Sequence, residues 1–528
     1  MTSPAQAPPS APPPALRRWV VVVCVAALLA EMAAAMVTAA LQQTPTIDEP
    51  VYVGAAAVYQ REHSLRPNPE HPPLGKLVMG AGLAVARPRL DEGFTGTQEA
   101  AGRHLLYESG NDARRVLLAA RLPMIVLTLL FGLVVFAFAA DLTGRAGGLV
   151  ALALYAFSPD VIAHGSLATL DVPASGFLLA SAWTLRRARE RPLPYLPLAA
   201  AALGAAAATK MSMLAAVPVL MALAACPRPS WRGRAGAALG MLAGTVAVVW
   251  ACYLAVDPRL RWTAPPGVPD IGGPRGLLVD LMPFPRPYRD GMRVQFGFED
   301  STWDGFLLGR HYRGSLWYYL PAALLVKTPL GMLALWAVGV GVLRRAALPL
   351  LLPAAVLLAV AMTGSRDLGV RYVIFIPMFL AVAAAACVTV PRLRFITAVL
   401  VLFVAVSSLR TFPYYLPYSN EAFGGPSRTH LRLHDSNVDW GQDLGRLADR
   451  LRTRYPDERV WLAYKGSGVP SYYGIHAGDP LLVPPDRVRG LLVVSDSWVA
   501  KADPRLTALL RDGRPVDEVG HSITIFRR

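Results

Sequence analysis

The stretch "RRWVVVVCVAALLAEMAAAMVTAALQQTPTIDEP", residues 17–50, decides the fold class. Two arginines precede a long, mainly apolar run from Trp19 to Leu41, with Glu31 as its one charged residue, and a spanning helix needs about 20 predominantly apolar residues. The run is longer than the roughly 7–15 apolar residues of a signal peptide. We therefore expect a retained membrane helix, with a cleaved signal peptide as the alternative. In either case the polar residues after the run lie outside the membrane.

The composition of the whole chain agrees with a polytopic α-helical membrane protein. Of 528 residues, 54% are hydrophobic and only 17% are charged, whereas a soluble protein carries about 25% charged residues. The net charge of +16 could suggest nucleic acid. Many arginines, however, fall in short clusters between apolar runs, as the positive-inside rule predicts. We expect contact with the lipid bilayer and no nucleic-acid partner.

The arginine clusters also predict the topology, because the chain must cross out and back between successive clusters. This predicts about eleven transmembrane helices within residues 17–410, an odd number that places the two ends of the chain on opposite sides. The expected spans are 19–41, 116–140, 147–166, 172–185, 195–209, 211–226, 236–256, 316–343, 346–363, 372–390 and 395–409. The Pro/Ala/Ser-rich residues 1–16 are expected to be a disordered cytoplasmic N-terminus.

Three polar regions are then expected on the extracytoplasmic side: loops 42–115 and 257–315, and the tail 411–528. The tail is long enough for a small domain. It is expected to be α/β, because "GQDLGRLADRLRTRY" has helical periodicity, with Asp439 as a possible N-cap. The segments "RVWLAYKG", "GLLVVSD" and "SITIFRR" have the composition of strands.

Two adjacent carboxylates, Asp48 and Glu49, follow the first span directly. Neighbouring side chains on a helix point about 100° apart, so a matched dyad is not expected. One carboxylate can face a cavity while the other caps or pairs. The alternative is a helix start, with Thr46 as N-cap and both carboxylates in the first turn, where the helix dipole favours them.

A second polar motif, "NPEHPPLGK", occupies residues 68–76. Its lysine, Lys76, opens the apolar segment "LVMGAGLAVA", which is too short to span and is expected to be an interfacial helix. Lys76 would then lie near the headgroups, either snorkelling or contacting a lipid phosphate. The second interpretation also draws attention to His71, which precedes two prolines.

An acidic pair after the first span, followed by "HPPLGK" about twenty residues on, resembles the protein O-mannosyltransferases and their bacterial relatives. This is glycosyltransferase family 39, within the membrane-embedded C-type glycosyltransferases, which also include the aminoarabinose transferase of lipid A. The resemblance covers roughly residues 17–410. The tail does not resemble the repeat domain of the eukaryotic mannosyltransferases.

Further positions fit this resemblance. "SPDVIAHGSLATLDVP" has the look of the family's turn between spans three and four, with Asp171 on the outer side. Lys210 in "ATKMSM", and Arg366 and Arg371 in "GSRDLGVRYVIFIP", lie on the outer side, where the positive-inside rule does not explain them. Contact with a lipid phosphate is one explanation. Pairing with the outer carboxylates, Asp367 among them, is the other.

Two other residues are candidates with open alternatives. Lys327 lies deep inside an expected span, where a lysine costs roughly 2.5–3.5 kcal/mol, so it either lines the site or pairs structurally. The following Thr328 and Pro329 predict a break in the helix. Trp440, in "HDSNVDWGQDLGRL", lies either in a turn with a helix cap or in contact with the sugar or acceptor.

The resemblance implies a polyprenyl-phosphate sugar as donor, carrying mannose or another hexose or pentose. The implied reaction is an inverting displacement onto an acceptor hydroxyl of a protein, lipid or glycan. Asp48 would be the base and Glu49 would orient the acceptor. Lys76, Arg371, His71, Lys210 and Arg366 would bind the donor phosphate, with Asp171 and Lys327 lining the site.

This scheme requires no cofactor and no metal, although it leaves a divalent cation open. The sequence contains no DxD or His cluster that would hold one. By analogy, we expect a bacterial plasma (inner) membrane, with a cytoplasmic N-terminus and an extracytoplasmic C-terminus. Two other classes stay open: a transporter, and a non-catalytic protein of envelope assembly. No symmetry between halves supports a transporter.

Overall fold

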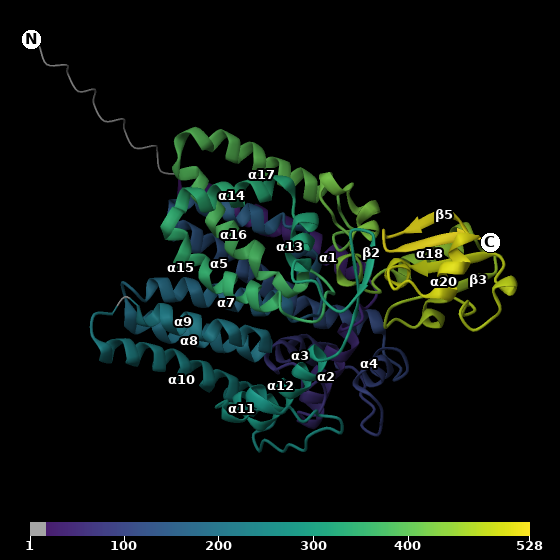
Figure 1. Ribbon diagram of the computed structural model, residues 1–528, viewed down its shortest axis with the longest axis horizontal. Helices are drawn as coiled ribbons and strands as arrows, with labels where there is room; N and C mark the ends of the chain where they lie inside the picture. Colours follow the sequence, from purple (N-terminus) through teal and green to yellow (C-terminus); the bar gives the residue numbers. More distant parts are fainter. Residues whose placement is uncertain (1–16, 227) are drawn as a thin grey trace, which may run out of the picture.

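The computed structural model describes residues 17–226 and 228–528, so the disordered N-terminus expected for residues 1–16 lies outside the described residues. Figure 1 shows a body of long helices with a small sheet at one end, at the right of the view. The sheet is built from the C-terminal residues, and it lies away from the end where α9 stops and α10 begins.

Among the described residues, six helices are long and apolar enough to cross a membrane. They are Arg18–Gln42, Ala113–Ala156, Pro192–Thr209, Trp231–Val256, Leu330–Ala361 and Pro391–Leu409. Shorter apolar helices lie between them. The chain is therefore a multi-pass membrane protein, while the count of eleven spans stays a prediction.

The first half of the helical body consists of helices that pack side by side. Its elements are α1 Arg18–Gln42, α5 Ala113–Ala156, α6 Pro159–Gly165, α7 Asp171–Arg187, α8 Pro192–Thr209, η1 Met211–Ala215, α9 Ala216–Ala225 and α10 Trp231–Val256. Gly144 breaks α5 with a φ of 81°, between the spans expected at 116–140 and 147–166. The alanine-rich α8 packs between α7 and α10, and small side chains permit such a close approach.

The second half of the body contains the break that the sequence predicts. Its elements are α13 Tyr319–Lys327, α14 Leu330–Leu343, η2 Arg344–Ala346, α15 Ala347–Ala361, η3 Val370–Val373, α16 Phe375–Ala384, η4 Ala385–Thr389, η5 Pro391–Leu393 and α17 Arg394–Leu409. α13 ends at Lys327 and α14 begins at Leu330. The break at Thr328 and Pro329 is therefore confirmed.

The two polar loops are folded rather than extended. Loop 42–115 holds α2 Glu49–Glu62, α3 Leu74–Ala86 and α4 Gln98–Tyr107, and loop 257–315 holds α11 Gly273–Leu281, α12 Arg286–Glu299, β1 Asp304–Leu307 and β2 Arg310–Arg313. The short apolar helix expected after Lys76 is α3, which begins two residues earlier, at Leu74. It packs against both α2 and the long α5, which fixes the position of loop 42–115 over the helical body.

The C-terminal residues form a four-stranded sheet in the order β3-β4-β6-β5, in which β3 and β4 are parallel and the other pairs are antiparallel. The elements are η6 Glu421–Phe423, η7 Pro426–Leu431, η8 Asp435–Asn437, α18 Leu444–Arg454, β3 Val460–Ala463, η9 Pro470–Tyr473, η10 Pro485–Arg487, β4 Leu491–Ser495, α19 Asp496–Val499, α20 Pro504–Arg511, β5 Arg514–Val519 and β6 Ile523–Arg527. The three predicted strands are β3, β4 and β6.

One predicted helix cap is wrong. The helix expected in "GQDLGRLADRLRTRY" is α18, but it begins at Leu444 and its N-cap position is Asp443, not Asp439. Asp439 instead accepts backbone hydrogen bonds from Gly441 and Ser497, at 3.1 Å each. Its carboxylate is engaged in joining two segments, which draws it away from the helix end.

Candidate active site

Asp48 and Arg371 form the exposed centre of the candidate site. Asp48 occupies the N-cap position of α2, and Arg371 lies in η3, in front of α16. The Arg371 Nη1 donates to Asp48 Oδ2 at 2.6 Å. The Asp48 side chain is 25% exposed and the Arg371 side chain 10%. A carboxylate and a guanidinium therefore meet at a point that is partly exposed to solvent.

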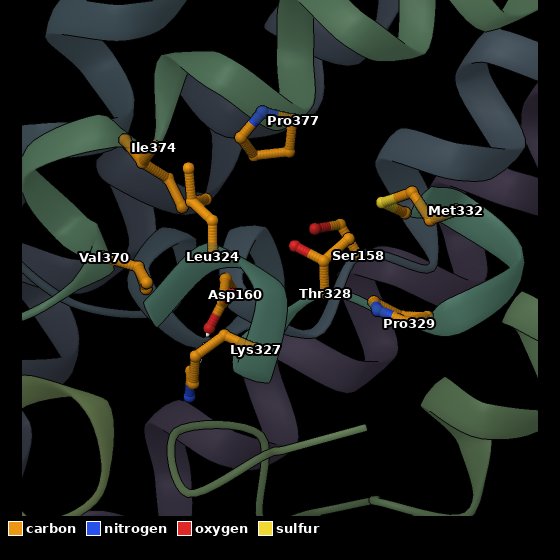
Figure 2. Close-up of a pocket in the computed structure, with 10 residues that line it drawn as sticks. All are labelled: Ser158, Asp160, Leu324, Lys327, Thr328, Pro329, Met332, Val370, Ile374 and Pro377. Atoms are coloured by element: carbon orange, nitrogen blue, oxygen red, sulfur yellow. Dashed lines mark ion pairs between the residues drawn. The ribbon is translucent and has the colours of Figure 1, made fainter. Parts of the chain in front are cut away.

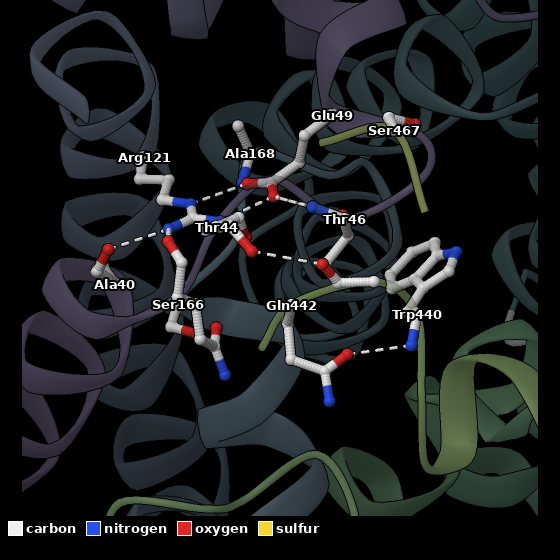
Figure 3. Close-up of polar contacts among 12 residues, drawn as sticks. Ala40, Thr44, Thr46, Glu49, Arg121, Ser166, Ala168, Trp440, Gln442 and Ser467 are labelled. Carbon is white, nitrogen blue, oxygen red and sulfur yellow. Dashed lines mark hydrogen bonds and ion pairs between the residues drawn. The ribbon is translucent and has the colours of Figure 1, made fainter. Parts of the chain in front are cut away.

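Glu49 points the other way, into a fully buried ion pair that Figure 3 shows. Arg121, from the apolar part of α5, donates through Nε to Glu49 Oε1 at 2.7 Å and through Nη2 to Oε2 at 2.6 Å. The backbone N–H groups of Thr46 and Ala168 each donate to the same carboxylate at 2.8 Å. Glu49 is 0% exposed, so it offers no surface to an acceptor.

The helix start that the sequence offers as an alternative is present in part: Glu49 lies in the first turn of α2, but the N-cap position is Asp48, not Thr46. Thr46 donates its N–H to the side chain of Glu49 and its carbonyl accepts from the Glu49 N–H at 3.3 Å. Glu49 is the first residue of α2, so this contact ties the helix start to the preceding segment and is not a capping box. The two interpretations of the acidic pair are therefore compatible, with Asp48 partly exposed at the N-cap position and Glu49 buried in the first turn.

Three of the predicted cations gather around one aromatic ring that the sequence analysis did not single out, Tyr372. The Lys210 ammonium lies 5.0 Å from the ring centroid, and the guanidinium carbons of Arg371 and Arg366 lie 5.0 and 5.9 Å from it. Lys210 also forms an ion pair with Asp171. These residues come from three segments of the chain, namely the start of α7, the junction of α8 with η1, and residues 366–372. Such a density of positive charge suits an anionic ligand.

Each of these cations also has a carboxylate partner. Arg371 pairs with Asp48 and Lys210 with Asp171, as the pairing alternative predicts. Arg366 pairs instead with Glu299 of α12, with Nη2 to Oε1 at 2.6 Å. Glu299 could not be proposed as its partner from the sequence, because α12 lies in a loop for which no secondary structure was predicted.

Lys76 and His71 are more buried than the sequence suggests. The Lys76 ammonium is 0% exposed and donates to the Asn68 carbonyl, the Asn68 side chain and the His71 carbonyl, at 2.9, 3.1 and 2.7 Å. Snorkelling is therefore wrong, because the head group faces inward. Burial lowers the pKa of Lys76 to about 7. Contact with a donor phosphate stays a prediction, and the ammonium already has three acceptors.

His71 is the one member of the predicted set with an unused ring nitrogen. Within the described part of the chain, its Nδ1 is buried and has no hydrogen-bond partner. Burial, followed by the positive charge of Lys210, lowers the pKa of His71 well below its usual value. The ring is therefore neutral at pH 7 and can form a hydrogen bond without adding charge.

Lys327 pairs structurally, and it also lines a small cavity of about 10 Å³ (Figure 2). Its ammonium lies 3.2 Å from Asp160 Oδ1 and donates to the carbonyls of Leu416 and Asn437, at 2.6 and 2.9 Å. The side chain is 0% exposed. These contacts join α6 to α13 and to two C-terminal segments, which supports a role in holding the site together.

Sequence reasoning missed Arg121, and a signal for it existed. A lone arginine inside an apolar run is costly and must have a buried partner. Glu49 was a possible partner, since it follows the first span. Among residues 17–226 and 228–528, no three His, Cys, Asp or Glu side chains converge as a group that could hold a metal ion.

Comparison with known proteins gives one family match. Residues 114–253 match the family model described as dolichyl-phosphate-mannose-protein mannosyltransferase. This range contains Arg121, Asp171 and Lys210. No curated protein sequence matches the chain.

Several solved structures match the chain at low sequence identity. ArnT from Cupriavidus metallidurans in the apo state is 14% identical, with 96% of this chain and 97% of that chain covered and a TM-score of 0.49. The S. cerevisiae protein O-mannosyltransferase Pmt1-Pmt2 complex bound to the sugar donor is 18% identical, over 45% and 33%, with a TM-score of 0.36. The oligosaccharyltransferase AglB from Archaeoglobus fulgidus, in complex with an inhibitory peptide and a dolichol-phosphate, is 10% identical, over 92% and 71%, with a TM-score of 0.47. The match of residues 114–253 to this family model agrees with the resemblance expected from the sequence, although the acidic pair and "HPPLGK" lie before the matched range.

Proposed function

We propose that this protein transfers a sugar from a polyprenyl-phosphate donor to an acceptor hydroxyl on the extracytoplasmic face of the membrane. The observation that carries the proposal is the meeting of a partly exposed carboxylate, Asp48, with a cluster of cations around Tyr372. The chemistry needs a base for the acceptor and positive charge for a departing phosphate. The matched family is named for a dolichyl-phosphate sugar, which supports a lipid-linked donor.

The reaction is an in-line displacement at the anomeric carbon, with inversion. Asp48 takes the proton of the acceptor hydroxyl as the acceptor oxygen bonds to the anomeric carbon. The bond from that carbon to the phosphate oxygen breaks, and the phosphate leaves with the electron pair. Arg371, Lys210 and Arg366 stabilise the charge that develops on it. Arg371 is paired with Asp48, so an incoming phosphate would compete for the guanidinium and free the carboxylate.

The remaining predicted residues take supporting roles in this scheme. Glu49 is fixed by Arg121 and positions the backbone that presents Asp48, rather than touching the acceptor. His71 offers a neutral hydrogen bond to the sugar or phosphate. Lys76 ties Asn68 and His71 into one folded loop. Asp171 holds Lys210.

The membrane orientation is part of the proposal. The arginine clusters between spans would face the cytoplasm, and the Asp48 site would face outward together with residues 411–528. Lipid-linked donors suit such a site, because nucleotide sugars are cytoplasmic. The plasma membrane as location, mannose or another hexose or pentose as the sugar, and a protein, lipid or glycan as acceptor belong to the same proposal.

The test is a turnover assay in lipid vesicles. Purified protein is given radiolabelled polyprenyl-phosphate mannose, with a membrane extract as acceptor. Asp48→Asn should lower the transfer rate about 10²- to 10⁴-fold, the usual contribution of one catalytic base. Asp270→Asn is the matched control, because it makes the same chemical change at an exposed position. Full activity of Asp48→Asn would remove Asp48 from the mechanism. A folded wild type that consumes neither this donor nor other polyprenyl-phosphate sugars would favour a transporter or an envelope-assembly protein.

A further inference from the structure

Residues 434–443, here called the strap, join the helical body to the C-terminal sheet. Every residue of the strap is buried, although it contains three aspartates, a histidine and two side-chain amides. Buried polar groups are costly unless they are hydrogen-bonded. Their partners therefore show what the strap does, and many of those partners lie next to the candidate site.

The strap holds the backbone immediately before Asp48. The Ile47 N–H donates to the Trp440 carbonyl at 3.0 Å, and the Thr44 N–H donates to the Gln442 carbonyl at 2.9 Å. Figure 3 shows Trp440 and Gln442 beside this segment, with the Trp440 N–H donating to the Gln442 side chain at 2.8 Å. The segment before Asp48 is thus held in place by residues from the C-terminal part of the chain.

The strap also holds the segment that carries Arg371. The Val370 N–H donates to the side-chain oxygen of Asn437 at 3.0 Å, and the Ser436 hydroxyl donates to the Leu368 carbonyl at 2.7 Å. The indole of Trp440 lies under the guanidinium itself, with 4.4 Å from the Arg371 Cζ to the ring centroid. The Trp440 ring therefore contacts the Arg371 guanidinium, while the Trp440 carbonyl accepts a hydrogen bond from Ile47, the residue before Asp48.

Trp440 cannot serve as a sugar platform in this arrangement, because it is only 1% exposed. Its ring is covered by Arg371 and lies edge-on to His164, with 6.0 Å between centroids. A buried indole under a guanidinium attracts it through the ring quadrupole, more strongly where water is excluded. Its effect on a ligand must therefore pass through Arg371.

We propose that Trp440 is a positioning residue, which holds the Arg371 guanidinium between the Asp48 carboxylate and the place of the donor phosphate. This inference rests on the proposed function. It makes the C-terminal residues part of the catalytic unit, because the strap supplies both the platform for the cation and the anchor for the base. The acceptor contact considered for Trp440 from the sequence is replaced by this role.

The test is a double-mutant cycle on turnover of polyprenyl-phosphate mannose and on binding of undecaprenyl phosphate in detergent micelles. Trp440→Leu keeps an apolar side chain but removes the ring, and should weaken transfer about 10- to 30-fold. Trp440→Phe keeps a ring and should stay within about threefold of wild type. In an Arg371→Met background, Trp440→Leu should cost less than about twofold, because residues that act through each other are not additive.

A matched control is present at the surface. Trp231 is 74% exposed, and the Arg232 guanidinium lies 5.7 Å from its ring, so Trp231→Leu removes an arginine–tryptophan contact far from the site. It should leave turnover and binding unchanged, and thermal melting of each variant reports whether it is folded.

Equal losses from Trp440→Leu with and without Arg371 would overturn the positioning role, as would an equal loss from Trp440→Phe. If the wild type is active and the Trp440 variants keep its turnover and binding, the positioning role of Trp440 is refuted while the proposed function stands. A wild type that neither turns over donor nor binds the probe overturns the proposed function, and with it the role of Arg371 used here.

Discussion

Arg121→Lys tests whether the buried ion pair with Glu49 holds the site together. Besides its two bonds to Glu49, Arg121 donates to the carbonyls of Ala40, Gln43 and Thr44, at 2.7, 3.0 and 3.1 Å. The guanidinium thus makes five hydrogen bonds, and lysine has only three donors. At least two acceptors lose their donor in a site that is 0% exposed.

The expected loss follows from this count. A buried polar group left without a partner costs about 1–3 kcal/mol, so two of them cost about 2–6 kcal/mol. This is a large part of a typical net stability of about 5–15 kcal/mol. The transfer rate should also fall at least about tenfold, because the Glu49 carboxylate holds Thr46, two residues before Asp48, and misplacement of a catalytic group by about 1 Å can cost as much as 10²-fold.

The measurement is the free energy of unfolding in detergent, followed by turnover of the surviving folded protein. Arg115→Lys, in the same helix but at an exposed position, is the control and should change stability by less than about 0.5 kcal/mol. Arg121→Lys with the stability and activity of Arg115→Lys would refute the reasoning. It would mean that the pair is dispensable and that the segment before Asp48 is held by the strap alone.

Two further predictions concern stability. Burial, and secondarily the charge of Asp496, raises the pKa of Asp439 from 3.8 to about 7. The folded state then keeps a proton that the unfolded state loses, so stability falls as pH rises from about 4 to 7, by at most about 4 kcal/mol. Asp439→Asn should flatten this slope in unfolding measured against pH, and an unchanged slope would assign it to other groups. Gly82→Ala should destabilise by about 1–3 kcal/mol or more, because its Cβ would lie 1.7 Å from the Ala119 carbonyl oxygen. Gly236→Ala, with open space around the new Cβ, should stabilise slightly, and equal thermal melting of the two variants would contradict the close contact.

The sequence predicts what depends on local pattern. The break after Lys327 follows from a Thr-Pro pair inside an apolar run, and the three predicted strands follow from their composition. The side that each loop faces is predicted from the arginine clusters. For this reason the amino-acid sequence alone assigns Asp48, Arg371 and Lys210 to the same surface.

The sequence could not predict which residues form ion pairs and hydrogen bonds with the site residues. Arg371 and Asp48 are separated by 323 positions, and no local pattern links them. Lys76 precedes an apolar segment and would be expected at a surface. Yet Asn68 and His71 fold back over its head group, and two of the three acceptors are backbone carbonyls, which any sequence possesses. Asp439 has the right residue type for a helix cap, but a tertiary contact to Ser497 competes for its carboxylate.

The two carboxylates at the start of α2 receive different roles from their surroundings. Asp48 is 25% exposed and faces cations that a ligand can reach, whereas Glu49 is 0% exposed and shares its charge with Arg121. Adjacent residues on a helix point about 100° apart, so one turn of chain can present a reactive group and anchor it at the same time. The cost of burying Glu49 is offset by Arg121 and the backbone donors. The Arg121 pair of α5 and the hydrogen bonds of Thr44 and Ile47 to the strap together fix the backbone that carries Asp48, and under the proposed function this supplies the rigidity that a catalytic base needs.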